Sequence, residues 1–306
     1  MALFAPITLA QALIYASLLS LMGVGVTLLY KTTKVPNFAH ASFVTLGGYV
    51  NFTLIADFHW NPYFGLPVSF VVVGVESLLL FFLVLEPLRK KKSSIALLMI
   101  ATLAWHIALL GFLGAYADSL QTFLRVPTRN VVLSYLDFTF GGLPGIFFVS
   151  ITVTLVAAVA LYFAIERTTI GIALRASMEN QNLAESVGIN TTRMLGIAWF
   201  LAAGLAGVAG ALLPMWTLLN TSSGDTLIAA MFCVSIVGGL ETLYGAFAGG
   251  VILALAQIVG TTMLANLVGV WLTGYEPVVP LLLMSIVLLT NPKGVGGMSV
   301  WKRLKR

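Results

Sequence analysis

KVPNFAHASF, residues 34–43, is a polar stretch with a proline and a histidine that separates two hydrophobic runs. Pro36 cannot donate a backbone hydrogen bond and suits the first turn of a helix, while Asn37 and Ser42 can cap freed backbone groups. A helix start is therefore expected here. Because broken membrane helices commonly line solute paths, Asn37 and His40 are candidates for such a path. The alternative is a helix cap with a structural histidine.

The composition places the whole chain in a membrane. Of its 306 residues, 59% are hydrophobic and 9% are charged, whereas soluble domains carry roughly 25% charged residues. Its hydrophobic runs approach the ~20 residues that a helix needs to cross a bilayer. No segment alternates polar with apolar residues as a membrane barrel requires. We therefore expect an all-α polytopic membrane protein.

Nine hydrophobic segments are candidate crossings. The segments at 38–56 and 225–240 are short or interrupted by glycine, so either could cross only part of the bilayer, and the expected bundle has eight or nine helices. The first run has neither a basic region before it nor a cleavage site, so it is expected to be a retained helix. The nine segments are 7–30, 38–56, 66–86, 94–116, 142–164, 192–213, 225–240, 245–265 and 270–290.

Basic residues predict the orientation. If the first helix runs from outside to inside, fourteen of the sixteen Lys and Arg residues fall on the inner side, and only Arg125 and Arg129 fall outside. The N-terminus is then outside the cell and the C-terminus is cytoplasmic. Residues 117–141 become an extracytoplasmic loop with a short hairpin, residues 165–191 become an inner loop, and residues 291–306 become a basic cytoplasmic tail.

The inner loop predicts a helix at the membrane surface, over about 173–187. Small or apolar residues recur in it at helical spacing among polar neighbours, and it ends at a glycine. A second glycine pattern, Gly204, Gly207 and Gly210, is typical of membrane helices that approach each other closely. The residues that set the spacing in the inner loop are Ala173, Ala176, Ala184, Val187 and the terminal Gly188.

Catalytic and metal-binding patterns are missing from the sequence. It has no HExxH, GxSxG or Walker-type glycine loop, and its three histidines lie in separate segments. The single cysteine, Cys233, excludes a disulfide and a cysteine-based metal site. We therefore expect no enzyme, no metal and no cofactor. The net charge of +5 follows the membrane sidedness of the loops, so nucleic acid is not expected as a partner.

Glu76, His106 and Glu241 are ionisable residues in or near hydrophobic segments. A charge at mid-bilayer costs roughly 2.5–3.5 kcal/mol, so Glu76 should face the bundle interior and be protonated or paired. Glu76 and His106 each lie ten residues from the outer ends of their segments, so they could meet at one depth. The alternative is that each is hydrogen-bonded separately.

Five motifs resemble the branched-chain amino-acid permeases of ATP-binding-cassette importers. They occur in the family's order along most of the chain. Two positions depart from the family pattern, Ala41 where a glycine is usual and Glu86 where a basic residue is usual. The motifs are PNFAHASFVTLGGY from Pro36, EPLRKKKSSIALLMIATLA at 86–104, RTTIGIALRASMENQNLAESVGIN at 167–190, VGGLETLYGAFAGG at 237–250 and NPKGVGG at 291–297.

The resemblance implies a single transmembrane permease domain over 1–306 that imports branched-chain or other amino acids. It implies two cytoplasmic ATP-binding subunits, a second similar permease in a favoured heterodimer, and an extracytoplasmic solute-binding protein. The surface helix would be a coupling helix that touches an ATP-binding subunit through Arg175, Ala176, Glu179, Asn182, Ala184, Glu185 and Gly188. The interrupted helices would hold the solute near Asn37, Phe38, His40, Gly47, Gly48, Gly238, Gly239 and Gly245.

An ion-coupled secondary transporter is the main alternative, because Glu76 and His106 could bind a coupling ion inside the membrane. A membrane-embedded enzyme is the third reading, and no nucleophile, base and orienting group converge at readable spacing to support it. The solute is not chosen by the sequence among branched-chain amino acids, other amino acids, urea and short amides.

Overall fold

Helices form nearly all the regular structure of residues 6–297, which the computed structural model describes. This confirms the expected all-α fold. The long helices are α1 (Pro6–Thr33), α3 (Leu66–Leu80), α5 (Ile95–Leu124), α6 (Gly145–Glu166), α9 (Thr191–Trp216), α11 (Leu243–Ala254) and α13 (Val278–Thr290). The π-helical turn Phe81–Leu85 continues α3 into α4 (Glu86–Lys90), and a second, Leu255–Gly260, continues α11 into α12 (Thr261–Val268).

The remaining elements connect these helices or insert between them. They are α2 (His40–Phe58), α7 (Thr169–Glu179), α8 (Gln181–Ser186), α10 (Ser223–Gly238), the 3₁₀ turns Ser134–Leu136, Val270–Tyr275 and Val295–Gly297, and the antiparallel strands β1 (Thr139–Phe140) and β2 (Leu143–Pro144). Within residues 6–297, seven helices are long and apolar enough to cross a membrane. The two segments expected to be partial crossings, α2 and α10, are not among the seven.

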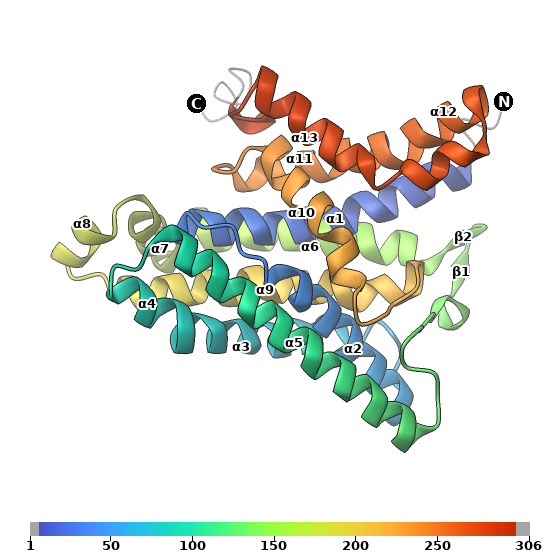
Figure 1. The fold of residues 1–306 in the computed structure, drawn as a ribbon, viewed down its shortest axis with the longest axis horizontal. Coiled ribbons are helices and arrows are strands. Elements are labelled where there is room, and N and C mark those ends of the chain that lie inside the picture. The colour runs from blue at the N-terminus through green and yellow to red at the C-terminus, as the bar shows by residue number, and fades with distance from the viewer. Residues whose placement is uncertain (1–5, 298–306) are drawn as a thin grey trace.

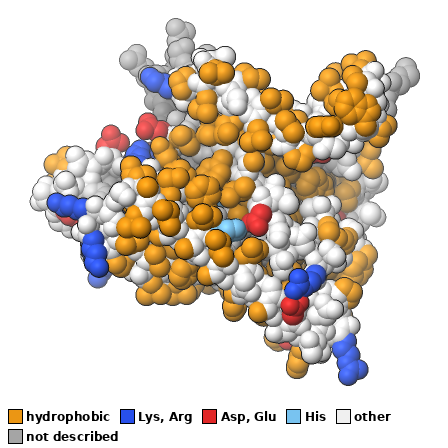
Figure 2. Space-filling view, in the orientation of Figure 1, with side chains coloured by type: hydrophobic (Ala, Val, Ile, Leu, Met, Phe, Trp, Pro, Cys, Tyr) orange, Lys and Arg blue, Asp and Glu red, His pale blue; other side chains and the backbone are white. Residues whose placement is uncertain are grey.

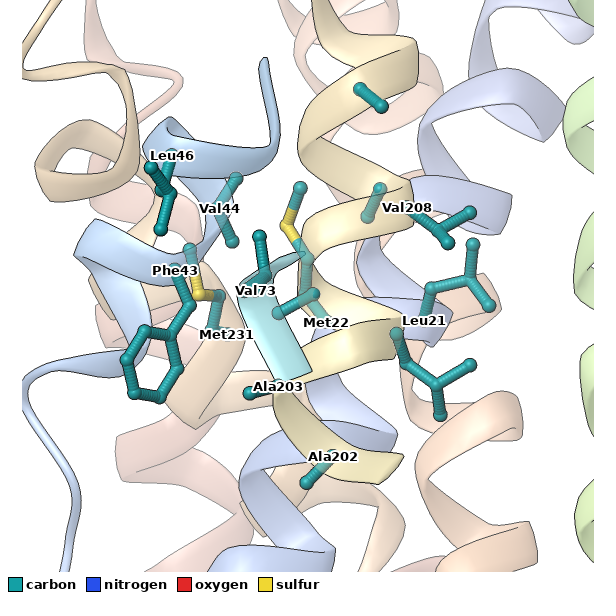
Figure 3. Packing of buried hydrophobic residues seen from close by; sticks show 14 of the residues in the cluster. Leu21, Met22, Phe43, Val44, Leu46, Val73, Ala202, Ala203, Val208 and Met231 are labelled. Carbon is teal, nitrogen blue, oxygen red and sulfur yellow. The ribbon is translucent and has the colours of Figure 1, made fainter. Parts of the chain in front are cut away.

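Two helices, α1 and α9, form the centre of the bundle. Buried residues fill 94% of the most apolar window of α1 and 83% of that of α9, against 39% or less for the other long helices. Figure 3 shows the core between them, where Phe43 and Val44 of α2, Val73 of α3, Ala203 of α9 and Met231 of α10 converge. The rest of the long helices surround this core and expose large apolar side chains, as helices in contact with lipid do.

Glycines allow the central helices to touch. A Cβ atom at Gly207 would collide with Val73 and the Ser69 carbonyl of α3, and one at Gly210 would collide with the Val44 carbonyl of α2. Of the predicted glycine stripe, Gly204 packs against the Phe70 ring of α3. The close approach that the spacing predicted is therefore present, with α2 and α3 as the neighbours.

The bundle has two distinguishable ends, which we name by what they carry. The α8 end carries α4, α7 and α8, and the hairpin end carries β1 and β2 (Figure 1). In the same view α11, α12 and α13 form an upper group, α3, α4 and α5 form a lower group, and α10 runs between them. The helix α10 thus lies in the middle of the molecule, and α2 begins beside it and runs toward the lower right of the view.

Three predicted elements differ from the structure. The inner loop has no single helix over 173–187, because Asn180 takes an extended conformation and separates α7 from α8, whose first turn it caps. The outer loop is shorter than 117–141, because α5 continues to Leu124 and only residues 139–144 form a hairpin. The last crossing begins at Val278, after Pro277, because 270–275 forms a 3₁₀ turn.

Both ends of the chain include predicted features that lie outside the described residues. They are residues 1–5, expected on the outer side, and 298–306, most of the predicted basic tail.

Candidate functional site

The first turns of α2 and α10 meet near the middle of the bundle. The Gly224 amide of α10 donates a hydrogen bond to Thr45 Oγ1 of α2 at 2.9 Å, and a Cβ atom at Gly224 would collide with the Ala41 carbonyl. Asn37 precedes this junction, and its Oδ1 accepts from the Ala39 amide at 3.0 Å. This bond precedes the helix, whose N-cap residue Ala39 has no side-chain cap hydrogen bond, so the predicted side-chain cap is not formed. The helix itself begins at His40, four residues after Pro36.

Three polar side chains from three helices form a cluster at this junction. Ser42 of α2 and Nδ1 of His106 of α5 lie 2.5 Å apart, and His106 Nε2 lies 3.2 Å from Oδ1 of Asp225 of α10. The serine is buried, while 12% of the His106 side chain and 36% of the Asp225 side chain are exposed. No third His, Cys, Asp or Glu side chain joins this pair in the described part of the chain.

Sequence reasoning missed Asp225 and gave Ser42 the role of a cap. The available signal was the position of Asp225, an acidic residue in the first turn of a short apolar helix. The missing information was its partner, because His106 is more than a hundred residues away along the chain.

The predicted pair of Glu76 and His106 is wrong. Glu76 Oε1 accepts a hydrogen bond from Nε1 of Trp105 at 2.5 Å, while its Oε2 is buried without a described partner. Trp105 precedes His106 in α5, and the two side chains bond to different helices. Equal depth did not bring the predicted partners together, because consecutive residues of a helix point in directions about 100° apart. Glu241 is exposed and lies 3.4 Å from Lys34.

A cavity of about 210 Å³ lies at the α8 end. Asn37 and Trp199 line it, and Asn37 Nδ2 and Trp199 Nε1 are buried donors without described partners. Arg89 and Gln181, the first residue of α8, also line it, and Arg89 donates to the side-chain oxygen of Gln181. The cavity wall is thereby hydrogen-bonded to α8. The remaining lining residues are Thr32, Thr33, Val35, Phe81, Leu85, Leu98 and Thr102.

A second cavity, of about 550 Å³, lies toward the other ends of these helices. Ser223 and Thr226, which flank Asp225 in the sequence, line it together with Trp216 and Glu276. Glu276 follows the 3₁₀ turn after α12, and burial raises the pKa of its carboxyl group. The two cavities share no lining residue. The Phe38 ring, next to Asn37 in the sequence, contacts the Phe232 ring of α10 edge to face, with centroids 5.8 Å apart.

The other predicted path residues line neither cavity. His40 is buried against α1, and its Nε2 lies 3.0 Å from the Met22 carbonyl oxygen. The five predicted glycines sit at helix contacts, where a Cβ atom would collide with a neighbour. Gly47 and Gly48 face α9 and Leu219, Gly238 and Gly245 face each other, and Gly239, with φ of +96°, faces the Lys293 carbonyl.

The predicted coupling residues divide into buried, bonded and exposed groups. Ala184 is buried, and Arg175 holds α7 against the end of α6 through its hydrogen bonds to the Ile165 carbonyl and to Glu166 Oε2. The Glu185 carboxylate accepts from Thr191 of α9. Ala176 is half-buried, whereas Glu179, Asn182 and Gly188 are exposed.

Two apolar residues that were not predicted as contacts are also exposed on this segment. They are Leu183 of α8 and Val187, which follows it, with 63% and 70% of their surfaces exposed.

Comparisons with known proteins agree with this architecture. Residues 8–288 match the family described as the branched-chain amino acid transport system permease component. The chain is 42% identical to the probable branched-chain amino acid transport permease protein LivH of Methanocaldococcus jannaschii, over 97% of this chain and 94% of the relative. It is 28% identical to the LivH permease of Escherichia coli K12 over 91% of each chain, and 26% identical to the BraD permease of Pseudomonas aeruginosa over 94% of each.

No solved structure was found to match the chain. The family match spans nearly all the helices described above, including α2, α10 and the α7–α8 segment. This multi-pass membrane protein therefore belongs to the family of permease components of branched-chain amino acid transport systems.

Proposed function

We propose that this chain is the permease of an ATP-driven importer of branched-chain or similar aliphatic amino acids. The printed names of its relatives support this solute class. In the proposed assembly the α8 end faces the cytoplasm and the hairpin end faces outward, in keeping with the basic residues in the loops. Two ATP-binding subunits drive transport, a second similar permease completes the path as a heterodimer, and an external binding protein delivers the solute.

The exposed apolar side chains of the α8 segment carry the proposal of ATP coupling. Leu183 and Val187 lie on a segment that is otherwise polar and is not among the candidate membrane spans. Exposed apolar residues at such a place are suited to burial by a protein partner. The hydrogen bond between Arg89 and Gln181 then links a docked α8 to the wall of the cavity beside Asn37.

The two cavities support a path along α2 and α10. In the proposal, solute from the hairpin end passes Thr226 and Asp225, and the contact between Phe38 and Phe232 separates it from the Asn37 cavity. ATP-binding subunits and the external binding protein can drive alternation only if each binds one conformation better than the other. Displacement of the Phe38 ring is the change that would join the cavities.

The proposal of ATP coupling is tested by substituting the exposed α8 residues. The double substitution Leu183→Asp and Val187→Asp should reduce co-purification of the ATP-binding subunits by about tenfold or more, because the charges would be buried at the contact. The permease should remain folded, since both positions are exposed. The matched control is Tyr135→Asp, which changes a residue that is 76% exposed in the outer loop. Unchanged co-purification of the double variant would exclude α8 as the contact.

Energy coupling separates this proposal from the ion-coupled alternative, for which His106 and Asp225 offer titratable groups inside the membrane. Uptake of L-leucine by the complete complex in proteoliposomes should require ATP in the compartment that the ATP-binding subunits face. It should persist when ionophores collapse proton and sodium gradients. Uptake that continues without ATP and stops with the ionophores would favour the secondary transporter.

A further inference from the structure

We propose that Asp225, held by His106 and Ser42, binds the α-ammonium group of the transported amino acid. This inference rests on the proposed function and deepens it, since it assigns one substrate group to one side chain. The site is distinct from the predicted path residues, because it uses an aspartate of α10 that the sequence did not single out.

The position of Asp225 demands a counter-charge. His106 is the twelfth residue of the thirty-residue helix α5, so the cluster lies roughly 17 Å along the axis from the start of the helix and roughly 27 Å from its end, away from the headgroups. About a third of the Asp225 side chain is exposed there. A carboxylate exposed to lipid at that depth costs roughly 2.5–3.5 kcal/mol, so it must face water, a partner or a cation.

Hydrophobic side chains border the cluster on one side (Figure 2). Figure 2 shows a histidine beside an acidic side chain among hydrophobic side chains, with most basic side chains nearer the margins of the view. Among the described residues, the ion pairs of Asp225 include no lysine or arginine, and its recorded partner is the His106 imidazole. A carboxylate in that setting retains hydrogen-bonding capacity for a primary ammonium group, which offers three donors.

The contacts behind Asp225 orient its carboxylate. Ser42 is buried and lies 2.5 Å from His106 Nδ1, which fixes the ring so that Nε2 faces Asp225. Thr45 of the same helix α2 accepts from the Gly224 amide and thereby anchors the turn that carries Asp225. His106 and Ser42 are therefore positioning residues, and Asp225 supplies the charge for the ligand.

The surroundings also suit an aliphatic amino acid. Ser223 and Thr226, two residues before and one residue after Asp225, line the cavity toward the hairpin end, so this cavity lies beside the turn of α10 that carries the carboxylate. Phe232 lies about two turns further along α10, beside Phe38. An amino acid bound through its ammonium group at Asp225 can place its branched side chain toward these two rings, which favour apolar contact.

The test uses the assembled complex in nanodiscs and three probes with the same branched skeleton. L-Leucine has both charged groups, isopentylamine has only the ammonium, and 4-methylpentanoate has only the carboxylate. Thermal protection of the wild-type complex is expected with L-leucine and isopentylamine, and not with 4-methylpentanoate. In Asp225→Asn the half-saturating concentration of L-leucine should rise about tenfold or more. Asp225→Glu should recover part of this loss, because it restores the charge.

The matched control is Asp118→Asn, which removes an exposed carboxylate that pairs with Arg129 at the outer end of α5. Its response to all three probes should equal that of the wild type. Equal leucine affinity in Asp225→Asn, or protection by 4-methylpentanoate that equals protection by leucine, would overturn the assignment. Loss of the second permease from the Asp225→Asn complex, with Asp118→Asn intact, would also overturn it and make Asp225 an interface residue.

If the proposed function is wrong, the experiments give a result that differs from failure of the Asp225 assignment. In that event ATP-binding subunits do not co-purify with the wild type, or uptake does not need ATP. Protection by isopentylamine can still be measured on the permease, and its loss in Asp225→Asn would support an ammonium site regardless of how transport is driven.

Discussion

The contacts of ionisable residues inside this membrane protein depend more on the direction in which each side chain points than on its depth in the bundle. Glu76 and His106 lie at comparable depth, yet Glu76 bonds to Trp105 and His106 bonds to Ser42 and Asp225. A helix changes direction by about 100° per residue, so adjacent positions of α5 serve two separate polar contacts. Each contact satisfies a group that would be costly to leave unpaired in an apolar surrounding.

At the residue scale, the hydrogen bond between Trp105 and Glu76 should contribute measurably to the stability of the fold. Trp105→Phe removes the indole donor and leaves both Glu76 oxygens without a described partner. We expect the free energy of unfolding to fall by about 1–3 kcal/mol, the usual cost of an unsatisfied buried polar group. Thermal unfolding of the purified complex measures this. Trp271→Phe, at a site that is 63% exposed, is the control and should have little effect. Equal stability of both variants would show that the bond contributes little.

At the scale of elements, two short helices bring polar groups into the middle of the bundle. The helices α2 and α10 both start inside it, and the Gly224 amide joins their first turns through Thr45. Asp225 and Ser42 lie near the starts of these two helices. If the helices crossed the whole bilayer, these two side chains would contact other side chains or lipid. Glycines at the α2–α9 contact let α2 approach closely enough for this arrangement.

Substitution of one contact glycine should therefore disrupt the bundle. Gly47→Ala adds a Cβ atom that collides with the Gly207 backbone, which cannot rotate away as a side chain can. We expect a loss of about 1–3 kcal/mol in stability, or loss of folded protein. Gly111→Ala is the matched control, because a Cβ atom there has no neighbour within 4 Å. It should leave the melting temperature unchanged or raise it slightly. A tolerated Gly47→Ala would contradict the close contact of α2 and α9.

At the scale of the whole molecule, the two ends of the bundle carry different structural features. The α8 end has an exposed apolar segment hydrogen-bonded to a cavity wall, and the hairpin end has loops tied by side-chain bonds such as that from the Tyr63 hydroxyl to Asp137 Oδ1 at 2.5 Å. Burial and the hydrogen-bonded Asp137 carboxylate both raise the pKa of Tyr63, so the phenol keeps its proton to donate. An importer needs such different ends, because it meets different partners on the two sides of the membrane.

The orientation of the molecule gives a prediction at this scale. Tyr135→Cys should react with a membrane-impermeant maleimide on intact cells, whereas Leu183→Cys should react only after permeabilisation. Both positions are largely exposed, and the natural Cys233 is buried, so background labelling should be low. Labelling of Leu183→Cys on intact cells would reverse the proposed orientation and exclude docking of α8 on cytoplasmic subunits.

The sequence by itself determined the class of fold, the order of the hydrophobic segments and the interruption near Asn37. These follow from local composition, because a bilayer requires long apolar helices and tolerates breaks only inside the bundle. The split between α7 and α8 was not determined, since Asn180 is compatible with a helix and its cap depends on its conformation.

Only the tertiary structure decided which polar residues meet. It assigned His40 and the five predicted path glycines to helix packing, joined Asp225 to His106 and separated His106 from Glu76. The physical reason is that such contacts depend on the rotation and crossing of helices far apart in the chain. Apolar periodicity constrains that rotation weakly when a helix is hydrophobic on nearly every side.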